Sequence, residues 1–121
     1  MNHILVVDDQ KDVANLYKTI IESANHKCTV AYSGKEALSV IKKTRFDIIL
    51  LDIAMPDIDG ITVLKKLSEY PNFSESKIIF VTAELPNGQT KETLTRLGAK
   101  NVVIKPINKR EMLKLISYYL T

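Results

Sequence analysis

The sequence predicts an α/β fold in which a parallel β-sheet is covered by helices on both faces. Five short apolar runs recur along the 121 residues, and most are rich in the β-branched residues that strands prefer. Segments with the 3.6-residue period of an amphipathic helix separate these runs. Strands that alternate with helices through short connections are typical of parallel sheets.

The expected strands are residues 4–7, 28–31, 48–51, 78–81 and 102–104. The first, third and fourth of these runs are apolar at every position instead of alternating between apolar and polar residues. A continuous apolar run is typical of a strand that is buried on both faces, as strands in parallel sheets are. We therefore expect helices on both sides of these three strands.

Each of the first three expected helices is predicted by a local sequence pattern. Residues 33–44 open on Ser33 and Glu36, which have the spacing of a capping box, where each side chain satisfies the other residue's backbone N–H. Residues 60–70 carry a short apolar stripe of Ile61, Val63, Leu64 and Leu67. Residues 11–25 place a longer stripe on one helical face: Val13, Leu16, Tyr17, Ile20, Ile21 and Ala24.

The last two expected helices differ in strength. Residues 87–97 have only Leu94 and Leu97 as large apolar anchors, and their three threonines are poor helix formers. Gly98 suits the C-terminal cap of this helix. We predict that it is the most mobile helix of the protein. Residues 108–120 open with Asn108 and Glu111 and place five apolar side chains on one face: Met112, Leu115, Ile116, Tyr119 and Leu120.

Length and composition limit the class of protein to which the chain can belong. The chain has the length of one domain, residues 1–121, and with 45% hydrophobic and 26% charged residues it is globular and not disordered. Its single cysteine, Cys28, cannot form an intramolecular disulfide. No apolar run approaches the roughly 20 residues of a membrane span, and no secretory signal opens the chain. We expect a cytoplasmic protein without a membrane partner. The net charge of +3 is only a weak argument for a nucleic-acid partner, and we expect no direct binding of nucleic acid because no tight run of Lys and Arg is interleaved with aromatic residues.

Polar side chains follow four of the five expected strands. Asp8 and Asp9 come after the first strand, Asp52 ends the third, Thr82 ends the fourth, and Lys105 with Pro106 ends the fifth. In an open parallel sheet, ligands bind outside the carboxyl ends of the strands. We therefore expect the candidate site at this edge, with the aspartates brought close together.

Three converging carboxylates would repel one another, so they need compensating positive charge, which a divalent cation and a fixed cation such as Lys105 can supply. Mg²⁺ fits, because it takes one or two carboxylates together with water and phosphate oxygens. Zinc does not fit, because His3 and His26 have neither the spacing nor the companions of a zinc site. A carboxylate nucleophile beside Mg²⁺, a lysine and a hydroxyl is the equipment of phosphoryl transfer, with Asp52 as the attacking group.

The chain resembles the receiver domain of two-component response regulators. The resemblance rests on five stretches in the same order and spacing as in that family, and they span the chain: residues 4–9, 47–60, 81–83, 98–99 and 105–106. It implies a flavodoxin-like (βα)5 fold, a three-layer sandwich with strand order 2-1-3-4-5, which is the order that the family's chemotaxis member illustrates.

The resemblance also implies roles for particular residues. Asp52 is the expected phosphoacceptor, and its donor is a phosphohistidine on a histidine kinase or a phosphotransfer protein. Asp9 is an expected Mg²⁺ ligand, Asp8 a ligand through water, and the backbone carbonyl of Ala54 a further ligand. The resemblance also implies that Thr82 is the switch hydroxyl and that Lys105 is its ion-pair partner, aimed inward by a cis peptide bond between Lys105 and Pro106. Ala54 and Glu84 match positions that tune phosphoryl lifetime in the family.

The implied function is a signalling switch and not an enzyme in the usual sense, although the domain assists its own phosphorylation and dephosphorylation. The added charge of a phosphoryl group, about −1.5 to −2, would recruit Thr82 and Lys105 and change the face of the fourth helix, fifth strand and fifth helix. The output partner stays open, as does a phosphorylation-dependent dimer. One position departs from the family, since Val102 stands where an aromatic residue usually couples to the switch hydroxyl.

Other readings of the sequence stay open beside this one. A haloacid-dehalogenase-type phosphatase would need a second aspartate at position 54, which is alanine. A nucleotide or flavin binder would need a Gly/Ser/Thr-rich loop after the first strand, where Asp8 and Asp9 would repel phosphate. A degenerate receiver that acts as a phosphorylation-independent interaction module is favoured only by Val102. The chain is either a complete regulator or the receiver of a longer protein.

Overall fold

The structure is a computed structural model that describes residues 2–71, 76–83 and 86–120. Within these residues, strands and helices alternate along the chain, as the sequence predicts. The strands are β1 (His3–Val7), β2 (Lys27–Ala31), β3 (Ile48–Leu51), β4 (Lys77–Thr82) and β5 (Ala99–Ile104). The helices are α1 (Lys11–Ser23), α2 (Gly34–Lys43), α3 (Gly60–Leu67), α4 (Gly88–Arg96) and α5 (Lys109–Leu120).

The five strands form one parallel sheet in the order β2-β1-β3-β4-β5. This order confirms the flavodoxin-like fold that the resemblance implied. β1 and β3 are direct neighbours, and Val7 at the end of β1 pairs with Leu51 at the end of β3. The chain leaves β1 toward β2 on one side and returns to β3 on the other, so the topological switch point, where open parallel sheets bind their ligands, lies at the carboxyl ends of β1 and β3.

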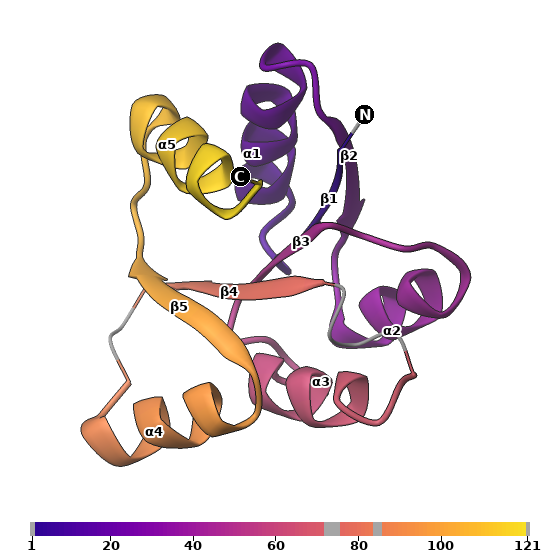
Figure 1. Ribbon diagram of the computed structural model, residues 1–121, viewed down its shortest axis with the longest axis vertical. Helices are drawn as coiled ribbons and strands as arrows, with labels where there is room; N and C mark the ends of the chain where they lie inside the picture. The colour runs from indigo at the N-terminus through magenta and orange to yellow at the C-terminus, as the bar shows by residue number, and fades with distance from the viewer. Residues whose placement is uncertain (1, 72–75, 84–85, 121) are drawn as a thin grey trace.

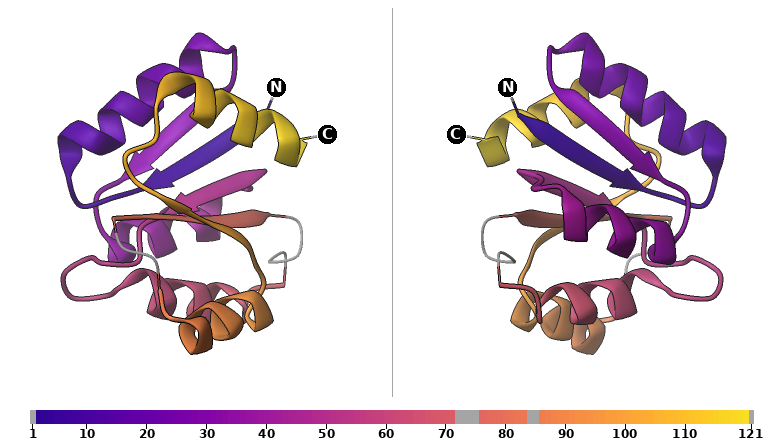
Figure 2. Two further views of the ribbon diagram at one scale, coloured as in Figure 1. Left: turned by 90° about the vertical axis from the view of Figure 1, so that its left-hand side faces the viewer. Right: turned by 90° about the vertical axis from the view of Figure 1, so that its right-hand side faces the viewer.

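The helices form a layer on each face of the sheet. Figure 1 and Figure 2 show α1 and α5 side by side on one face, and α2, α3 and α4 on the other. Each layer closes a separate apolar core against the sheet, one around Ile4, Ile48 and Ile116 and the other around Leu5, Leu51 and Leu64. A buried leucine or isoleucine side chain contributes about 2 kcal/mol to the stability of such a core.

Short polar side chains begin the helices where the sequence predicts capping. The Ser33 hydroxyl accepts the Glu36 backbone N–H at 3.1 Å, which confirms this half of the expected capping box, whereas the Glu36 carboxylate accepts the N–H of Tyr32 at 3.5 Å and not that of Ser33. At the start of α5 the capping is reciprocal, since Asn108 Oδ1 accepts the Glu111 N–H at 2.8 Å and the Glu111 carboxylate accepts the Asn108 N–H at 3.4 Å. Gly98 follows α4 with φ of 111°, a left-handed conformation that suits the glycine cap expected there.

Two details differ from the sequence-based expectation. Leu16 was expected on the buried stripe of α1 but is 56% exposed, whereas Tyr17 is only 4% exposed. Successive helical residues turn by about 100°, so a stripe centred on Tyr17 leaves Leu16 outside it. β5 also begins three residues earlier than expected, at Ala99. The prediction missed this start because Lys100 and Asn101, in the first half of this edge strand, are exposed polar residues without an apolar signal.

The prediction that α4 is the most mobile helix rests on its thin anchorage. Within α4 only Leu94 is buried. Helices with few buried apolar contacts open at low free-energy cost. In native-state hydrogen exchange, the α4 amides should therefore exchange faster than those of α1, which buries four residues. Equal protection of the two helices would contradict this prediction.

Among the described residues, none of the helices combines the length and the apolar character needed to cross a membrane.

Candidate functional site

Three aspartates meet at the carboxyl edge of the sheet. Asp8 and Asp9 follow β1 and Asp52 follows β3, so the pairing of these two strands brings them together. One carboxylate oxygen from each lies within 4.8 Å of the others. Asp8 and Asp52 are buried, with 2% and 6% exposure, whereas Asp9 is the most exposed of the three.

Lys105 joins two of these aspartates. Its Nζ donates to Asp8 Oδ2 at 2.6 Å and to Asp52 Oδ2 at 3.1 Å, and its side chain is 14% exposed. The lysine reaches the cluster from the end of β5, where its backbone N–H donates to the Thr82 carbonyl at 2.8 Å. The Lys105–Pro106 peptide bond is cis, as the resemblance implied.

Backbone amides fix the other oxygens of the same two carboxylates. Asp8 Oδ1 accepts the Gln10 N–H at 2.9 Å, and Asp52 Oδ1 accepts the Ala54 N–H at 3.2 Å. Each buried carboxylate is therefore held at one oxygen by its own loop and at the other by Lys105. A carboxylate oriented at both oxygens loses little further freedom when it reacts or binds a ligand.

Burial and charge act in opposite directions on this cluster. Burial raises the pKa of Asp52 and the Asp8 charge adds to the rise, while the bonds from Lys105 and Ala54 oppose it. Burial disfavours the charged form of Lys105, but its bonds to Asp8 and Asp52 outweigh burial and raise its pKa. Burial is therefore the main cause of the raised pKa of Asp52, whereas the two carboxylates are the cause of the raised pKa of Lys105.

The cluster has the composition and charge of a divalent-cation site. Three carboxylates against one ammonium leave two uncompensated negative charges when all four groups are ionised. All the side-chain donors are oxygens, which suits Mg²⁺ and excludes the nitrogen and sulfur ligands of a zinc site. Asp8, Asp9 and Asp52 therefore fit a magnesium ion on both charge and donor type.

The other expected site residues lie at the same edge or along β5. Thr82 ends β4 and is buried, with 4% exposure. Pro106 is exposed beside Lys105. Val102 is half-buried in β5, where it pairs with Phe80 and packs against the core beneath α4. Glu84 lies outside the described residues.

Gly60 is a site residue to which the sequence analysis assigned no role. It is the first residue of α3, and its N–H donates to the Ile53 carbonyl at 2.8 Å. A Cβ atom at this position would lie 2.2 Å from the backbone oxygen of Asp52. The helix can therefore approach the loop that presents Asp52 only because residue 60 has no side chain. The Asp59-Gly60 pair at a helix start was the available signal.

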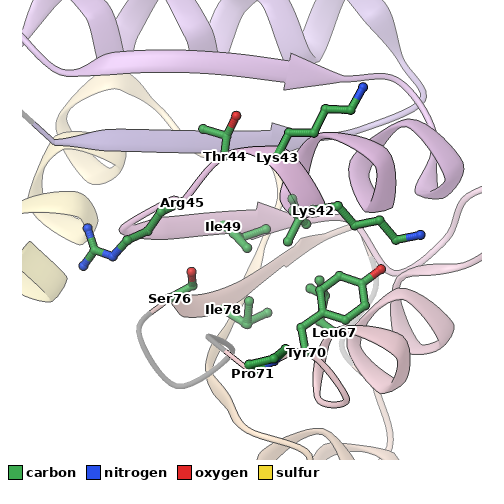
Figure 3. A pocket seen from close by; sticks show the side chains of 11 residues that line it. Lys42, Lys43, Thr44, Arg45, Ile49, Leu67, Tyr70, Pro71, Ser76 and Ile78 are labelled. Atoms are coloured by element: carbon green, nitrogen blue, oxygen red, sulfur yellow. The ribbon is translucent and has the colours of Figure 1, made fainter.

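A hollow lies at the end of the sheet opposite to the acidic cluster. It has a volume of about 350 Å³ and is lined by the apolar side chains of Ile49, Leu67 and Ile78 near the C-terminal ends of α2 and α3. Figure 3 shows Lys43 and Arg45 directed away from it. No carboxylate is among the described residues that line it, so it lacks the groups of the phosphoryl chemistry. The candidate site is the acidic edge.

The pH dependence of stability tests the burial of Asp52. We expect Asp52→Asn to be more stable than the wild type by on the order of 1 kcal/mol at pH 7 without divalent cations, because it removes a buried charge. Since the pKa of Asp52 is raised in the fold, the wild-type carboxylate takes up a proton as pH falls toward 4 and its cost disappears. Urea unfolding in chelator measures the free energy of unfolding of both proteins at pH 7 and pH 4, and the advantage of Asp52→Asn over the wild type should be smaller at pH 4. A difference that widens on acidification would contradict this account.

Comparison with known proteins places the chain in a family. Residues 4–117 match the response regulator receiver domain, and the chain belongs to this family. The curated response regulator SaeR of Staphylococcus aureus, from strains USA300 and NCTC 8325, is 36% identical over 121 residues, which are 100% of this chain and 51% of SaeR. The chain thus spans about half the length of these curated relatives.

Solved structures share the fold over nearly the whole chain. The chemotaxis protein CheY4 of Vibrio cholerae has a TM-score of 0.92 at 27% identity, with 98% of each chain covered. A CheY-like receiver domain protein of Methanospirillum hungatei has a TM-score of 0.89 at 29% identity, covering 99% of this chain and 94% of its own. The Thermotoga maritima response regulator TrrA, solved with Mg²⁺ and BeF, has a TM-score of 0.82 at 28% identity, covering 98% and 99%.

Proposed function

We propose that this chain is a phosphoacceptor switch in which Asp52 receives a phosphoryl group from a phosphohistidine. The observation that carries the proposal is Lys105 bound to both Asp8 and Asp52 within the buried acidic cluster. The donor is a histidine kinase or a phosphotransfer protein, as the receiver family implies.

We propose the cytoplasm as the location of the chain. Cys28 is a buried free cysteine, which suits a reducing compartment.

Each residue of the cluster has its own role in the phosphoryl transfer. A carboxylate oxygen of Asp52 forms a bond to phosphorus while the bond from phosphorus to the donor histidine nitrogen breaks. Asp8, Asp9, Asp52 and the Ala54 carbonyl would hold Mg²⁺, which supplies charge stabilisation at the phosphoryl oxygens when bound. Lys105 remains beside Asp52 to neutralise a further oxygen, and the Thr82 hydroxyl donates a hydrogen bond to another.

The output is a changed surface and not a released product, so the domain acts as a switch and not as a classical enzyme. Phosphorylation adds about −1.5 to −2 charge beside Thr82, which ends β4, and Lys105, which follows β5. These strands lead directly into α5 and α4, so the α4–β5–α5 face is the surface that we expect a partner to read. Glu84 and Ala54 remain our candidates for tuning phosphoryl lifetime.

A second candidate function is an interaction module that works without phosphorylation. Val102 favours it, because a valine has no ring to swap between buried and exposed positions, and Val102 already packs against the core that contains Phe80. Under the first proposal, backbone shifts in α4 and β5 must carry the signal instead. The Val102→Tyr variant should then change partner binding, and unchanged binding in both phosphorylation states would remove this position from the mechanism.

Phosphotransfer from histidine kinases tests the proposal. A panel of kinases carrying ³²P on histidine should include one that labels the wild type rapidly, and Asp52→Asn should take up no label from it. Asp57→Asn is the matched control, since Asp57 is an exposed aspartate of the same loop and should leave labelling unchanged. Equal labelling of wild type and Asp52→Asn would overturn the assignment of Asp52. Failure of the whole panel to label a folded wild type would favour the interaction module.

A further inference from the structure

Tyr32 is an aromatic residue at the carboxyl edge of the sheet that the proposed chemistry does not use. It follows the last residue of β2, as Asp8 follows the last residue of β1, and these last residues, Ala31 and Val7, are paired in register. Its side chain packs against the core that α1 and α5 close. Tyr32 therefore lies one strand away from the acidic cluster, on the side of β1 that faces away from β3.

Contacts with two helices fix the orientation of Tyr32. Its hydroxyl donates to Asn15 Oδ1 of α1 at 2.8 Å, and its backbone N–H donates to the Glu36 carboxylate of α2 at 3.5 Å. These helices lie on opposite faces of the sheet (Figure 1). A tyrosine held at both its backbone and its hydroxyl keeps its ring in one place, so the face of the ring is available to a cation.

The ammonium of Lys11 lies over this ring. Its Nζ is 5.3 Å from the centroid of the Tyr32 ring, which is within the range of a cation–π contact. Lys11 is the first residue of α1 and Asn15 comes four residues later, so the two share one face of the helix. The hydrogen bond between Tyr32 and Asn15 therefore keeps the ring beside Lys11.

Charge alone would place Lys11 elsewhere. Lys11 follows Asp9 by two residues, and Asp9 is the most exposed carboxylate of a cluster that has two uncompensated negative charges. A lysine at the first position of a helix is also repelled by the positive end of the helix dipole. Even so, Lys11 forms no ion pair with any carboxylate in the part of the chain that the structure describes. The Tyr32 ring thus competes with the acidic cluster for this ammonium.

We propose that Tyr32 is a positioning residue that keeps the Lys11 ammonium away from Asp9 and so leaves the acidic cluster open to Mg²⁺. The inference deepens the proposed function, since it rests on the Mg²⁺ site that the phosphoryl transfer uses. Without the ring, Lys11 would pair with Asp9, and an arriving Mg²⁺ ion would have to displace it. The affinity for Mg²⁺ should then fall about threefold, the factor to which a cation–π contact of an exposed lysine corresponds.

The test is a double-mutant cycle in the full chain, with the wild type, Tyr32→Leu, Lys11→Met and the variant that carries both substitutions. Mg²⁺ affinity is measured without phosphodonor, from the NMR shifts of the Asp9 and Gln10 amides during a Mg²⁺ titration. The second readout needs no metal: it is the shift of the Lys11 side-chain protons, which the Tyr32 ring moves upfield in the wild type. Lys18→Met is the matched control, since Lys18 is another lysine of α1 but pairs with a glutamate, and its loss should leave Mg²⁺ affinity unchanged.

Tyr32→Leu should bind Mg²⁺ about threefold more weakly than the wild type, and its Lys11 protons should lose their upfield shift. In the Lys11→Met background, the same tyrosine substitution should leave Mg²⁺ affinity unchanged, because no ammonium is left to compete. Equal affinity of the wild type and Tyr32→Leu overturns the inference. An equal loss of affinity with and without Lys11 also overturns it, because the loss would then come from the loop and not from the lysine.

The same measurements separate this inference from the proposed function. A wild type that binds Mg²⁺ but takes up no phosphoryl group contradicts the proposed function, and the four affinities still decide the role of Tyr32. Absence of Mg²⁺ binding in both the wild type and Lys11→Met overturns the inference. Should Tyr32→Leu not fold, Tyr32→Met is measured in its place, with the same results expected and the same results overturning the inference.

Discussion

Replacing Lys105 by methionine should lower the free energy of unfolding by about 2 kcal/mol in the absence of divalent cations. Methionine keeps most of the volume of lysine, so the loss comes from the charge. Asp8 and Asp52, both buried, then face each other without the ammonium that binds them at 2.6 and 3.1 Å. The loss is smaller than for a fully enclosed ion pair, because one carboxylate can take up a proton.

Magnesium distinguishes this explanation from a simple packing defect. Mg²⁺ should restore a large part of the lost stability in Lys105→Met, because it supplies the missing positive charge at the same carboxylates. Urea unfolding with chelator and with millimolar Mg²⁺ measures both effects. Lys18→Met is the control: Lys18 pairs with Glu22 at 2.9 Å on the surface of α1, and its loss should cost less than about 0.5 kcal/mol with no response to Mg²⁺. A Lys105→Met variant as stable as the wild type in chelator would contradict the account.

The Gly60→Ala variant should be destabilised by about 3 kcal/mol, the upper end of the usual cost of overpacking. Its new Cβ would lie 2.2 Å from the Asp52 carbonyl oxygen and 2.9 Å from Ile53 Cα. Both contacts are to backbone, so the clash cannot be relieved by a side-chain rotation. Either α3 or the loop that presents Asp52 must move, and phosphorylation at Asp52 should slow with it.

Gly88→Ala provides a closely matched control. Gly60 and Gly88 are each the first residue of a helix and each follows a capping residue, Asp59 or Asn87, whose side chain accepts a backbone N–H. A Cβ on Gly88 meets nothing within 4 Å. Gly88→Ala should therefore be neutral or slightly stabilising, as expected from the helix propensity of alanine. Thermal unfolding should give a lower melting temperature for Gly60→Ala than for Gly88→Ala. Equal melting temperatures would contradict the prediction that a side chain at residue 60 clashes with the backbone of Asp52.

The central part of the fold could be predicted from the sequence because its signals are strong and local. The strands around Ile4, Ile48 and Ile78 are continuous apolar runs, and Ser33 begins its helix where the capping pattern predicts. The edge strand β5 was only partly predicted, because Lys100 and Asn101 face solvent and carry no apolar signal. The prediction that Leu16 is buried was wrong, because a hydrophobic residue at the margin of an apolar helical stripe can be either buried or exposed.

The site was predicted less completely than the fold. The sequence shows that polar residues follow four strands, so the meeting of Asp8, Asp9 and Asp52 could be expected from parallel-strand geometry alone. It does not show that Lys105 binds both Asp8 and Asp52, because this contact joins residues far apart in the chain. The close approach of Gly60 to the Asp52 backbone is likewise a tertiary contact. Such contacts depend on how elements pack, which periodicity does not encode.

Intact-mass spectrometry after incubation with acetyl phosphate tests the central claim most directly. The wild type with Mg²⁺ should gain the mass of one phosphoryl group, in an adduct that survives acid and is lost in base, as an acyl phosphate is. Removal of Mg²⁺ with chelator should prevent the adduct, and Asp52→Asn should not form it while Asp57→Asn does. An adduct of equal yield on Asp52→Asn, or one that forms equally without Mg²⁺, would contradict the assignment of Asp52 as a magnesium-dependent phosphoacceptor.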